Sequence, residues 1–555
     1  MRVPFHLLQF KSTINKKHNK ALKCCTINSR SMAKKSSTTP PTKGIPIVLT
    51  GSATEMSDFK LNPIRAFTGG FPTAIIPRFI LRRYWYPRVP KNEDYTAKFA
   101  AYGIRKIEAV LIKEFGEEKV AVVHPYDLKK VVGPNTKVVG ITSMEPVGTG
   151  FVSRTYTSLV GFGGEPVAAA EFRNLITKPI LRKWGAKIIL GGSGSWQIHK
   201  AKLQKTYGID CIVLGEGEKT ALEIFRKALK GEKLPKVVET KSPDPMEICT
   251  IVKPSIFGTV EITRGCGRAC KFCSPMMRRR YSFPLEHIIQ EVKLNAKNGT
   301  RMIILASEDI FLYQCNDKFL PNHQAIVKLI NSIASIPEVE FIQPAHAALA
   351  PVVYNPKMIE EIGPVLLKKS FWITNGTRHS SVEVGIETGS IRLMKKYMAG
   401  KMLPYKPEEW QDVVTKAVEI MNENYIWPLG TLIIGLPEET EEDTIATLEL
   451  VDKLKHKKLF YVPLLFTSED DCMLREAGHM DLKHLTSLQW ELLATCWRHN
   501  IEIFTTNLAK WPSKVGGILA YTLYYRWKHG KKVLNPLLRL SGMNPDYPKD
   551  KKLQI

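Results

Sequence analysis

Short apolar runs that have the character of β-strands alternate with longer runs of helical spacing along most of the chain, and this alternation limits the possible folds more than any other feature. In the first part of the chain, a helical run at 95–116 is followed by four strand-like runs, at 119–125, 136–144, 186–194 and 210–218. Strands that are apolar throughout and separated by helices predict a parallel sheet covered on both faces. We therefore expect a doubly wound, Rossmann-like α/β domain at 45–231, with its ligand beyond the carboxyl ends of the strands.

A second alternating series occupies 257–480. Its strand-like runs are 258–265, 301–307, 339–347, 381–388, 429–437 and 459–466. The helical runs 284–299 and 440–455 begin at Pro284 and Thr440, which are typical residues for a helix start. Six βα units predict a partial (β/α)6 barrel, whose chemistry takes place at the carboxyl ends of the strands. We expect the proline-rich stretch 232–256 to be a linker and 481–555 to be a helical region with a basic tail.

The charge of the chain is strongly basic, with a formal net charge of +27 over 555 residues. Nucleic acid is one explanation for such a balance, but much of the excess lies at the two ends and no RRM or KH signature is present, so nucleic-acid binding is not favoured. Residues 1–44 are expected to be a disordered basic leader, with either Met1 or Met32 as the start. No apolar run approaches the roughly twenty residues that cross a bilayer. We therefore expect a cytoplasmic protein without a membrane span.

Three of the ten cysteines lie close together, in "RGCGRACKFC" at 264–273. Cys266, Cys270 and Cys273 have the spacing C-x3-C-x2-C and follow directly after the first strand of the second series. A structural zinc site needs four ligands, and no fourth Cys or His follows within reach. A [4Fe–4S] cluster held by three thiolates leaves one iron free to bind another ligand. We therefore expect these cysteines to hold such a cluster at the carboxyl edge of the barrel.

This cysteine motif, with Phe272 before its last cysteine, resembles that of the radical SAM superfamily over roughly 257–466. In that family the open iron binds the amino and carboxylate groups of S-adenosylmethionine (SAM), which is cleaved by one electron to a 5′-deoxyadenosyl radical. The resemblance implies SAM contacts in "LASEDIF", "GIETGS" and "IIGLPEET". The residues concerned, together with Phe272, are Ser307, Glu308, Gly385, Glu387, Ser390 and Gly435. The glycines that the family places beside the amine-binding acid are absent, and a solvated loop acid is the other reading of Glu308.

A doubly wound domain that precedes such a barrel resembles the class B, cobalamin-dependent radical SAM group. The stretches "GITSM", "LGGSG" and "VLGEGEKT" carry this resemblance. It implies a cobalamin site formed by Ser143, Met144, Gly191, Gly192, Gly215, Glu216 and Gly217. The signature Asp-x-His-x-x-Gly is absent, so the resemblance implies cobalamin without a histidine below the cobalt. A degenerate domain retained for packing is the alternative.

The reaction implied by the resemblance is transfer of a methyl group from methylcobalamin to an unactivated carbon. Within the group, the chain looks most like archaeal methylases of methyl-coenzyme M reductase, with the glutamine C-methylase as the leading candidate. This implies a protein or peptide substrate and an electron donor such as ferredoxin or flavodoxin. A radical SAM cyclase or methylase acting on a small molecule, lipid or RNA remains the alternative, as does a cofactor-binding protein without catalysis. We expect His346 to be a core or lumen histidine. Five residues are expected either at the cavity or in the core: Met144, Glu145, Tyr313, Trp372 and Tyr461.

Overall fold

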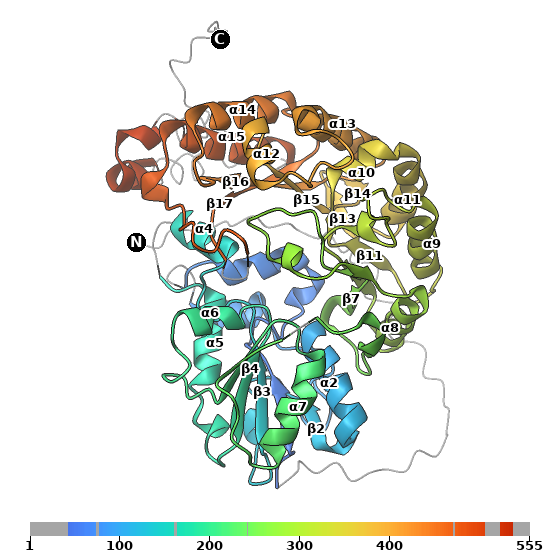
Figure 1. The fold of residues 1–555 in the computed structure, drawn as a ribbon, viewed down its shortest axis with the longest axis vertical. Helices are drawn as coiled ribbons and strands as arrows, with labels where there is room; N and C mark the ends of the chain where they lie inside the picture. Colours follow the sequence, from blue (N-terminus) through green and yellow to red (C-terminus); the bar gives the residue numbers. More distant parts are fainter. Residues whose placement is uncertain are drawn as a thin grey trace, which may run out of the picture. The chain divides into compact units, whose positions relative to one another are not determined.

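The computed structural model describes residues 43–73, 77–159, 164–240, 242–469, 472–504, 522–534 and 536 (Figure 1). Almost all of the expected leader, 1–44, therefore lies outside the described residues, as does much of the expected helical region after residue 504. Within 40–555 the chain forms one compact unit. No helix among the described residues is long and apolar enough to span a membrane.

The first domain is built on a six-stranded parallel sheet of order β2-β1-β3-β4-β5-β6. The strands are β1 (Ile47–Thr50), β2 (Val120–Val122), β3 (Val138–Thr142), β4 (Lys187–Gly191), β5 (Cys211–Leu214) and β6 (Val237–Glu239). The four strands expected from the sequence are present as β2 to β5. β1 was not expected, although it pairs with both β2 and β3. β6 lies in the stretch that was expected to be a linker, so that expectation was wrong at this strand.

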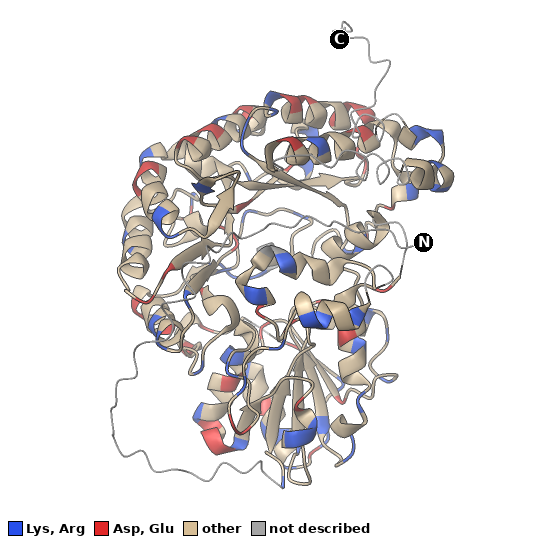
Figure 2. Ribbon diagram, turned by 180° about the vertical axis from the view of Figure 1, so that it is seen from behind, with Lys and Arg blue, Asp and Glu red and all other residues tan. Residues whose placement is uncertain are grey.

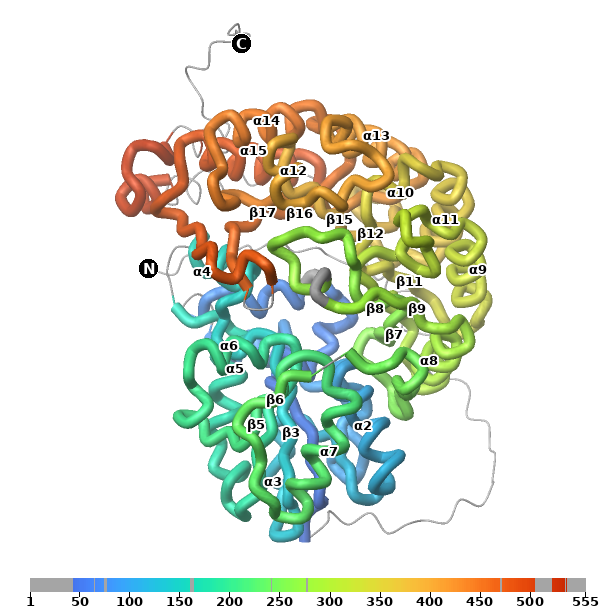
Figure 3. The backbone as a smooth tube through the Cα atoms, viewed as in Figure 1, coloured from blue at the N-terminus to red at the C-terminus, as the bar shows by residue number. Residues whose placement is uncertain are grey.

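Helices cover both faces of this sheet, as a doubly wound fold requires (Figure 3). Alternate residues of β1 show the two layers. Ile47 and Leu49 pack in one apolar cluster with residues of α2 (Tyr102–Phe115) and α7 (Glu218–Leu229). Val48 packs in the opposite cluster with α5 (Val167–Ile176). Further helices of this domain are α1 (Arg78–Tyr84), α3 (Leu128–Val131), α4 (Phe151–Leu159) and α6 (Ser195–Lys200).

The second domain is a curved array of parallel strands in sequence order. Its ladders are β11-β10-β7 and β12-β15-β16-β17. The strands are β7 (Val260–Glu261), β10 (Met302–Ala306), β11 (Phe341–Pro344), β12 (His346–Ala347), β15 (Glu383–Glu387), β16 (Leu429–Ile434) and β17 (Phe460–Leu465). Ala345 joins the ladders, because its N–H donates to the carbonyl oxygen of Leu305 at 3.1 Å and its own carbonyl accepts from Glu383 N–H at 3.1 Å. The six strand positions expected from the sequence are thus occupied.

Two short antiparallel pairs accompany this array. β8 (Thr263–Arg264) pairs with β9 (Tyr281–Ser282), and β13 (Trp372–Thr374) pairs with β14 (Thr377–His379). Both pairs lie beside the parallel strands and were not expected from the alternating pattern.

Helices line the outer side of the array (Figure 1). They are α8 (Leu285–Lys297), α9 (His323–Ala334), α10 (Leu349–Tyr354), α11 (Pro356–Lys368), α12 (Ile391–Tyr397), α13 (Trp410–Glu423), α14 (Glu441–Lys453) and α15 (Ser487–Phe504). The two expected helix starts are confirmed. Pro284 is the residue before α8, and Thr440 precedes α14 with its N–H donating to Asp443 Oδ2 at 2.8 Å. Residues 522–529 are also helical.

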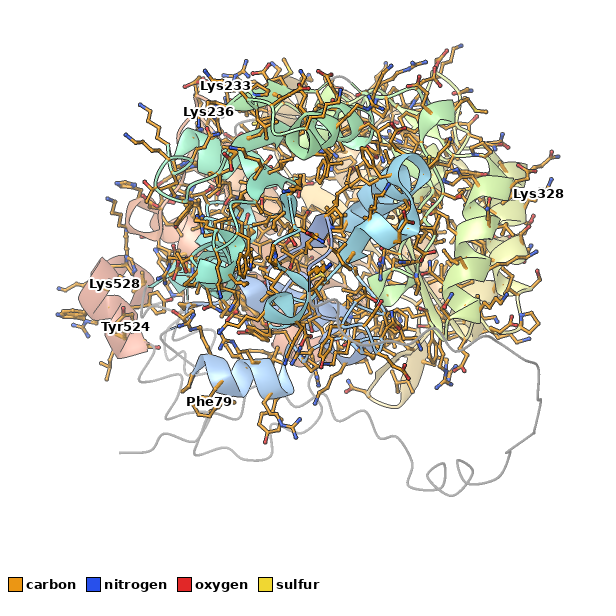
Figure 4. The ribbon with its side chains drawn as sticks, turned by 90° about the horizontal axis from the view of Figure 1, so that it is seen from below. Phe79, Lys233, Lys236, Lys328, Tyr524 and Lys528 are labelled. Atoms are coloured by element: carbon orange, nitrogen blue, oxygen red, sulfur yellow. The ribbon has the colours of Figure 1, made fainter. Side chains whose placement is uncertain are left out.

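The described basic residues do not gather on one element. Figure 2 shows Lys and Arg interspersed with Asp and Glu along the outer helices. In Figure 4, Lys233 and Lys236 project near β6, Lys328 projects from α9 and Lys528 projects from the helix at 522–529. A nucleic-acid site normally concentrates its positive charge in one patch or stripe. The described outer helices of the barrel show no such stripe.

A buried ion pair joins the first domain to the barrel. Lys106 of α2 lies with its Nζ 2.6 Å from Glu291 Oε1 of α8, and both side chains are buried. Tyr102 donates its hydroxyl to Glu291 Oε2 at 2.8 Å, and the Lys106 ammonium also donates to the carbonyl oxygen of Cys249 at 2.8 Å. Charges can be buried when their hydrogen-bonding groups are satisfied in this way.

Replacing Lys106 with Met is predicted to lower the free energy of unfolding by about 3–5 kcal/mol, because Glu291 is left buried without its cation. The exposed pair Lys455–Asp452 provides a matched control, and Lys455→Met should cost less than about 1 kcal/mol. Urea unfolding followed by tryptophan fluorescence measures both variants. Equal losses in the two variants would contradict the structural role of the buried pair.

Candidate cluster and cofactor sites

The three cysteines lie on a tightly wound loop that begins where β8 ends. Gly265 has a φ of 71°, and a Cβ there would lie 2.6 Å from the carbonyl oxygen of Arg279. Glycine is therefore required at this turn. Further along the loop, the N–H of Cys273 donates to the carbonyl oxygen of Cys270 at 3.0 Å. The backbone thus holds Cys266, Cys270 and Cys273 on one compact turn, with all three thiols free of disulfides.

The thiols need positive charge if they are to ionise. Burial raises the pKa of all three, and a neighbouring thiol adds to the rise at Cys270, whose pKa is about 11, and at Cys273. Iron supplies such charge, and a [4Fe–4S] cluster takes one thiolate per iron. Among the described residues, no three His, Cys, Asp or Glu side chains converge on one point as a single metal ion requires. Three thiols on one loop, with Cys270 buried and Cys266 and Cys273 half-buried, fit the donor set of a [4Fe–4S] cluster.

Arg268 anchors the cysteine loop to the barrel. Its buried guanidinium donates from Nη2 to Asp309 Oδ2 at 3.2 Å and from Nη1 to the carbonyl oxygen of Lys401 at 3.4 Å. Asp309 also accepts the N–H groups of Phe311 and Ala348 at 3.0 and 2.9 Å. Asp309 is therefore committed to holding the loop on the ends of β10 and β12.

Glu308 is the residue of "LASEDIF" whose carboxylate is left available. The hydroxyl of Ser307 is buried, contacts the hydroxyl of Thr263 and donates to the carbonyl oxygen of Asp309 at 2.8 Å. Glu308 is half-buried and makes no hydrogen bond or ion pair with any other described residue. It lies near the cysteines, since the pKa of Cys273 is raised first by burial and then by Cys270 and Glu308. An acid in this position can receive a cationic group beside the cluster loop.

In "GIETGS", Glu387 forms a buried ion pair, one of the two roles expected for an acid at the end of a buried strand, but its partner Lys401 was not predicted. Lys401 Nζ donates to Glu387 Oε1 at 2.9 Å, and Thr431 donates its hydroxyl to Glu387 Oε2 at 3.2 Å. Burial alone would lower the pKa of Lys401, but Glu387 and then Cys270 raise it above its usual value. Lys401 therefore keeps its positive charge beside the cysteines. It lies in the loop after α12, outside any motif that would have marked it.

Gly385 has a packing role in the same ion pair. A Cβ there would lie 2.1 Å from Glu387 Oε1 and 2.4 Å from Lys401 Nζ. Glu387 itself has a φ of 66°, and the ladder with β16 shifts register between Gly385 and Glu387. The missing side chain thus lets the ion pair cross the strand.

The remaining SAM positions also have partners within the protein. Ser390 caps α12, accepting the N–H of Leu393 at 3.2 Å and donating to Asp443. Gly435, with a φ of 82°, donates its N–H to Glu439 Oε2 at 2.9 Å. Phe272 is half-buried against the barrel core. SAM contacts at these three positions stay predictions.

In the first domain, the strand-end glycines differ in what surrounds them. At Gly192 a Cβ would lie 2.6 Å from the backbone nitrogen of Ser143, and at Gly215 it would lie 2.6 Å from Thr240 Oγ1. Protein atoms therefore fill the space at these two glycines. Gly191 has no such neighbour within 4 Å. It is the position where the backbone is open to a ligand.

The other expected cobalamin residues also include some that contact protein atoms and some that are exposed. Ser143 donates its hydroxyl to the carbonyl oxygen of Gly191 at 3.1 Å, whereas the side chain of Met144 is exposed. Gly217 has Ile107 of α2 at ordinary contact distance. Glu145, next to Met144, is half-buried and accepts from Gln197 Nε2 at 2.8 Å.

Glu216 forms an ion pair with Arg264, which lies two residues before Cys266 in the sequence. Arg264 Nη1 lies 2.8 Å from Glu216 Oε2, and its Nη2 lies 2.8 Å from Glu218 Oε1 and 2.7 Å from Glu261 Oε2. Burial opposes the charge of Arg264, but Glu261 and Glu218 raise its pKa, so it stays a cation. This ion-pair group joins the carboxyl end of β5 to the start of the cysteine loop. The two candidate cofactor regions are therefore adjacent.

Three of the five residues that were expected either at the cavity or in the core lie in different parts of the barrel domain. Tyr313 and Tyr461 are fully buried in the barrel core, and Tyr461 contacts His499 of α15 on the outer side. Trp372 lies before β15, near the amino end of the strands, and donates its Nε1–H to Gln343 Oε1 at 2.7 Å. The core reading holds for the two tyrosines.

Comparison with known families identifies the second domain. Residues 260–451, which include the cysteine loop and the stretches "LASEDIF", "GIETGS" and "IIGLPEET", match the model of the radical SAM superfamily. The chain therefore carries a radical SAM domain, and this implies a [4Fe–4S] cluster and SAM as cofactors.

Curated relatives of this domain are methylthiotransferases. The chain is 25% identical over 275 residues to the tRNA-2-methylthio-N(6)-dimethylallyladenosine synthase of Thermotoga petrophila, covering 49% of this chain and 57% of that protein. It is 25% identical over 269 residues to the ribosomal protein uS12 methylthiotransferase RimO of Phocaeicola vulgatus, covering 47% and 57%. The chain thus spans little more than half the length of these relatives.

Solved structures of TsrM, a radical S-adenosylmethionine methyltransferase from Kitasatospora setae, share the fold. The TsrM structure with cobalamin and a [4Fe–4S] cluster matches with a TM-score of 0.54 and 13% identity, covering 89% of this chain and 99% of TsrM. The TsrM structure with tryptophan and a SAM analogue matches with a TM-score of 0.50 and 15% identity, covering 75% and 72%. At this identity the likeness is one of fold.

Gly385→Ala is predicted to lower the free energy of unfolding by about 1–3 kcal/mol, because the added methyl displaces the Glu387–Lys401 pair. Gly103 of α2, which has no neighbour within 4 Å of an added Cβ, is the matched control. Gly103→Ala should leave stability unchanged or raise it. Thermal unfolding compares the two, and an unchanged midpoint for Gly385→Ala would show that the pair tolerates the methyl.

Proposed function

We propose that this protein is a cobalamin-dependent radical SAM methyltransferase that transfers a methyl group from methylcobalamin to an unactivated carbon. The observation that carries the proposal is the contact of Arg264 with Glu216 and Glu218, which brings the strand ends of a doubly wound domain beside a three-cysteine loop. The radical SAM match and the fold shared with TsrM support the same assignment.

In this proposal each cysteine of the loop holds one iron of the cluster. Bound together, the cluster and cobalamin would supply an electron that cleaves SAM and a methyl group that is transferred to the substrate. Glu308 would bind the amino group of SAM, since its carboxylate has no partner among the described residues. Ser307, Gly385, Glu387, Ser390, Gly435 and Phe272 complete the proposed SAM set. Of these, Glu387 would act through Lys401, whose charge it holds next to Cys270.

The first domain would bind cobalamin at the carboxyl edge of its sheet. Gly191 leaves the backbone open there and Met144 is exposed, so these two residues would face the ligand. Ser143, Gly192, Gly215 and Gly217 would shape the surrounding loops, and Glu216 would tie this edge to the barrel. His124 is buried after β2, and burial lowers the pKa of its imidazole to about 3. A cobalamin site without a histidine ligand agrees with the absence of the usual signature around His124.

A second candidate is methylthio transfer, which the curated relatives favour. Such a reaction needs a source of sulfur. Outside the motif, the described cysteines are dispersed: Cys211, Cys249, Cys315, Cys472 and Cys496. The described residues therefore offer no second group of cysteines for a sulfur-supplying cluster, which favours methyl transfer. A protein substrate, and specifically the glutamine of methyl-coenzyme M reductase, stays a prediction of the sequence resemblance, as do the electron donor and the cytoplasmic location.

The cysteine assignment is tested by anaerobic reconstitution with iron, sulfide, hydroxocobalamin and labelled SAM. We expect 5′-deoxyadenosine and S-adenosylhomocysteine to form, and we expect Cys266→Ala, Cys270→Ala and Cys273→Ala each to reduce deoxyadenosine at least a hundredfold. Cys249→Ala, outside the motif, is the control and should retain it. Deoxyadenosine at the wild-type rate in any of the three motif variants would refute the cluster site.

The cobalamin site is tested at Gly191. Gly191→Leu should reduce bound cobalamin at least tenfold, because the side chain occupies the open space above the strand end. Gly103→Leu, on an open helix surface, should bind normally. Visible absorbance of the reconstituted, desalted proteins gives cobalamin per chain. Equal loading of both variants would argue against cobalamin at this edge.

A further inference from the structure

The inner face of the barrel carries a histidine–glutamate pair that the proposed cofactor sites do not use. On β15, Val384 and Ile386 pack in the barrel core, so Glu383 points to the opposite face. His346 of β12 is its partner in the ladder. His346 Nε2 and Glu383 Oε2 are 3.7 Å apart, too far for a direct hydrogen bond.

The imidazole of His346 is fixed in one tautomer. Its Nδ1 lies 2.8 Å from the carbonyl oxygen of Ser307, and a carbonyl oxygen only accepts. Nδ1 therefore donates to this oxygen, and in the neutral tautomer Nε2 is the acceptor that lies towards Glu383. Ser307 is the neighbour of Glu308, so the pair lies beside the proposed SAM region.

The pair is partly accessible to solvent. The His346 and Glu383 side chains keep 44% and 30% of their surface exposed, although they lie on neighbouring strands of the array. Burial nevertheless raises the pKa of Glu383. Accessible atoms in a desolvated position are what a ligand-binding surface offers.

A tyrosine of the first domain lies close enough to Glu383 to be affected by its charge. Tyr156 of α4 is half-buried, and its pKa is raised to about 12, first by burial and then by Glu383. α4 is held against the barrel because Leu465 N–H of β17 donates to Thr155 Oγ1 at 2.9 Å. The surface is thus built from both domains.

The charge of Glu383 has no partner of its own. Glu387, on the same strand, is paired with Lys401, whereas the carboxylate of Glu383 makes no hydrogen bond and no ion pair with a lysine or arginine among the described residues. A desolvated carboxylate is costly until it is paired. A nitrogen donor placed about 2.8 Å from both Nε2 and Oε2 fits the 3.7 Å separation and satisfies both acceptors.

We propose that His346, Glu383 and Tyr156 form the substrate-binding site and that it takes a cationic nitrogen group, an ammonium or guanidinium. This inference rests on the proposed function for its place in a reaction, but the binding itself requires no turnover. A substrate with such a group would be held across the inner face, beside the region that Glu308 and the cysteines border.

The test compares two probes that differ in charge but hardly in shape, L-argininamide and its urea analogue L-citrullinamide. Equilibrium dialysis with the reconstituted full chain gives their dissociation constants. The cationic probe should bind at least tenfold more tightly than the neutral one. Glu383→Gln should remove at least tenfold of that affinity, and Tyr156→Trp should also weaken it because the larger ring occupies the same surface.

The control is Glu361→Gln, since Glu361 forms an exterior pair with His323 at 3.1 Å and should not affect the probe. Equal binding of the two probes, or full affinity in both Glu383→Gln and Tyr156→Trp, would overturn the inference. Wild-type protein that binds the cationic probe but forms no deoxyadenosine would instead refute the proposed function and leave the binding site standing.

Discussion

The guanidinium of Arg264 is the point on which the arrangement of this protein depends. It receives Glu216 and Glu218 from the first domain and Glu261 from the barrel, with all four side chains largely buried. One cation among three carboxylates is stable only while the geometry is kept, because losing the guanidinium would leave three acids unpaired. Since Cys266 follows two residues later, the interaction that joins the domains also fixes the start of the cysteine loop.

The inner face of the barrel also carries carboxylates, and among the described residues only one of the two on β15 is paired with a lysine or arginine. Glu387 is neutralised by Lys401, and that ion pair in turn places a positive charge beside thiols that resist ionisation. Glu383, four residues earlier on the same strand, has no such cation. The strand therefore carries one carboxylate that serves the cluster loop and one that is available to a ligand.

The regular parts of the fold and the cysteine loop were predictable from the sequence, because each is encoded locally. Apolar runs with helical runs between them gave the positions of β2 to β5 and of the barrel strands. β6 was not predicted because it lies among prolines and lysines, whereas β1 is an apolar run as long as β5 and was simply overlooked. The ion pairs of Glu216 and Lys401 were not predicted for another reason. They depend on residues 48 and 14 positions away, Arg264 and Glu387, and no local pattern reports such distant pairs.

The central claim is that cobalamin and the cluster are bound side by side in this chain. Electron paramagnetic resonance of the reconstituted protein, with the cluster reduced and the cobalamin in its cob(II) form, tests it most directly. Two paramagnets held at adjacent strand ends should broaden or split each other's signals. Two unperturbed spectra that simply add, or a cobalamin signal that belongs only to free cofactor, would contradict the account.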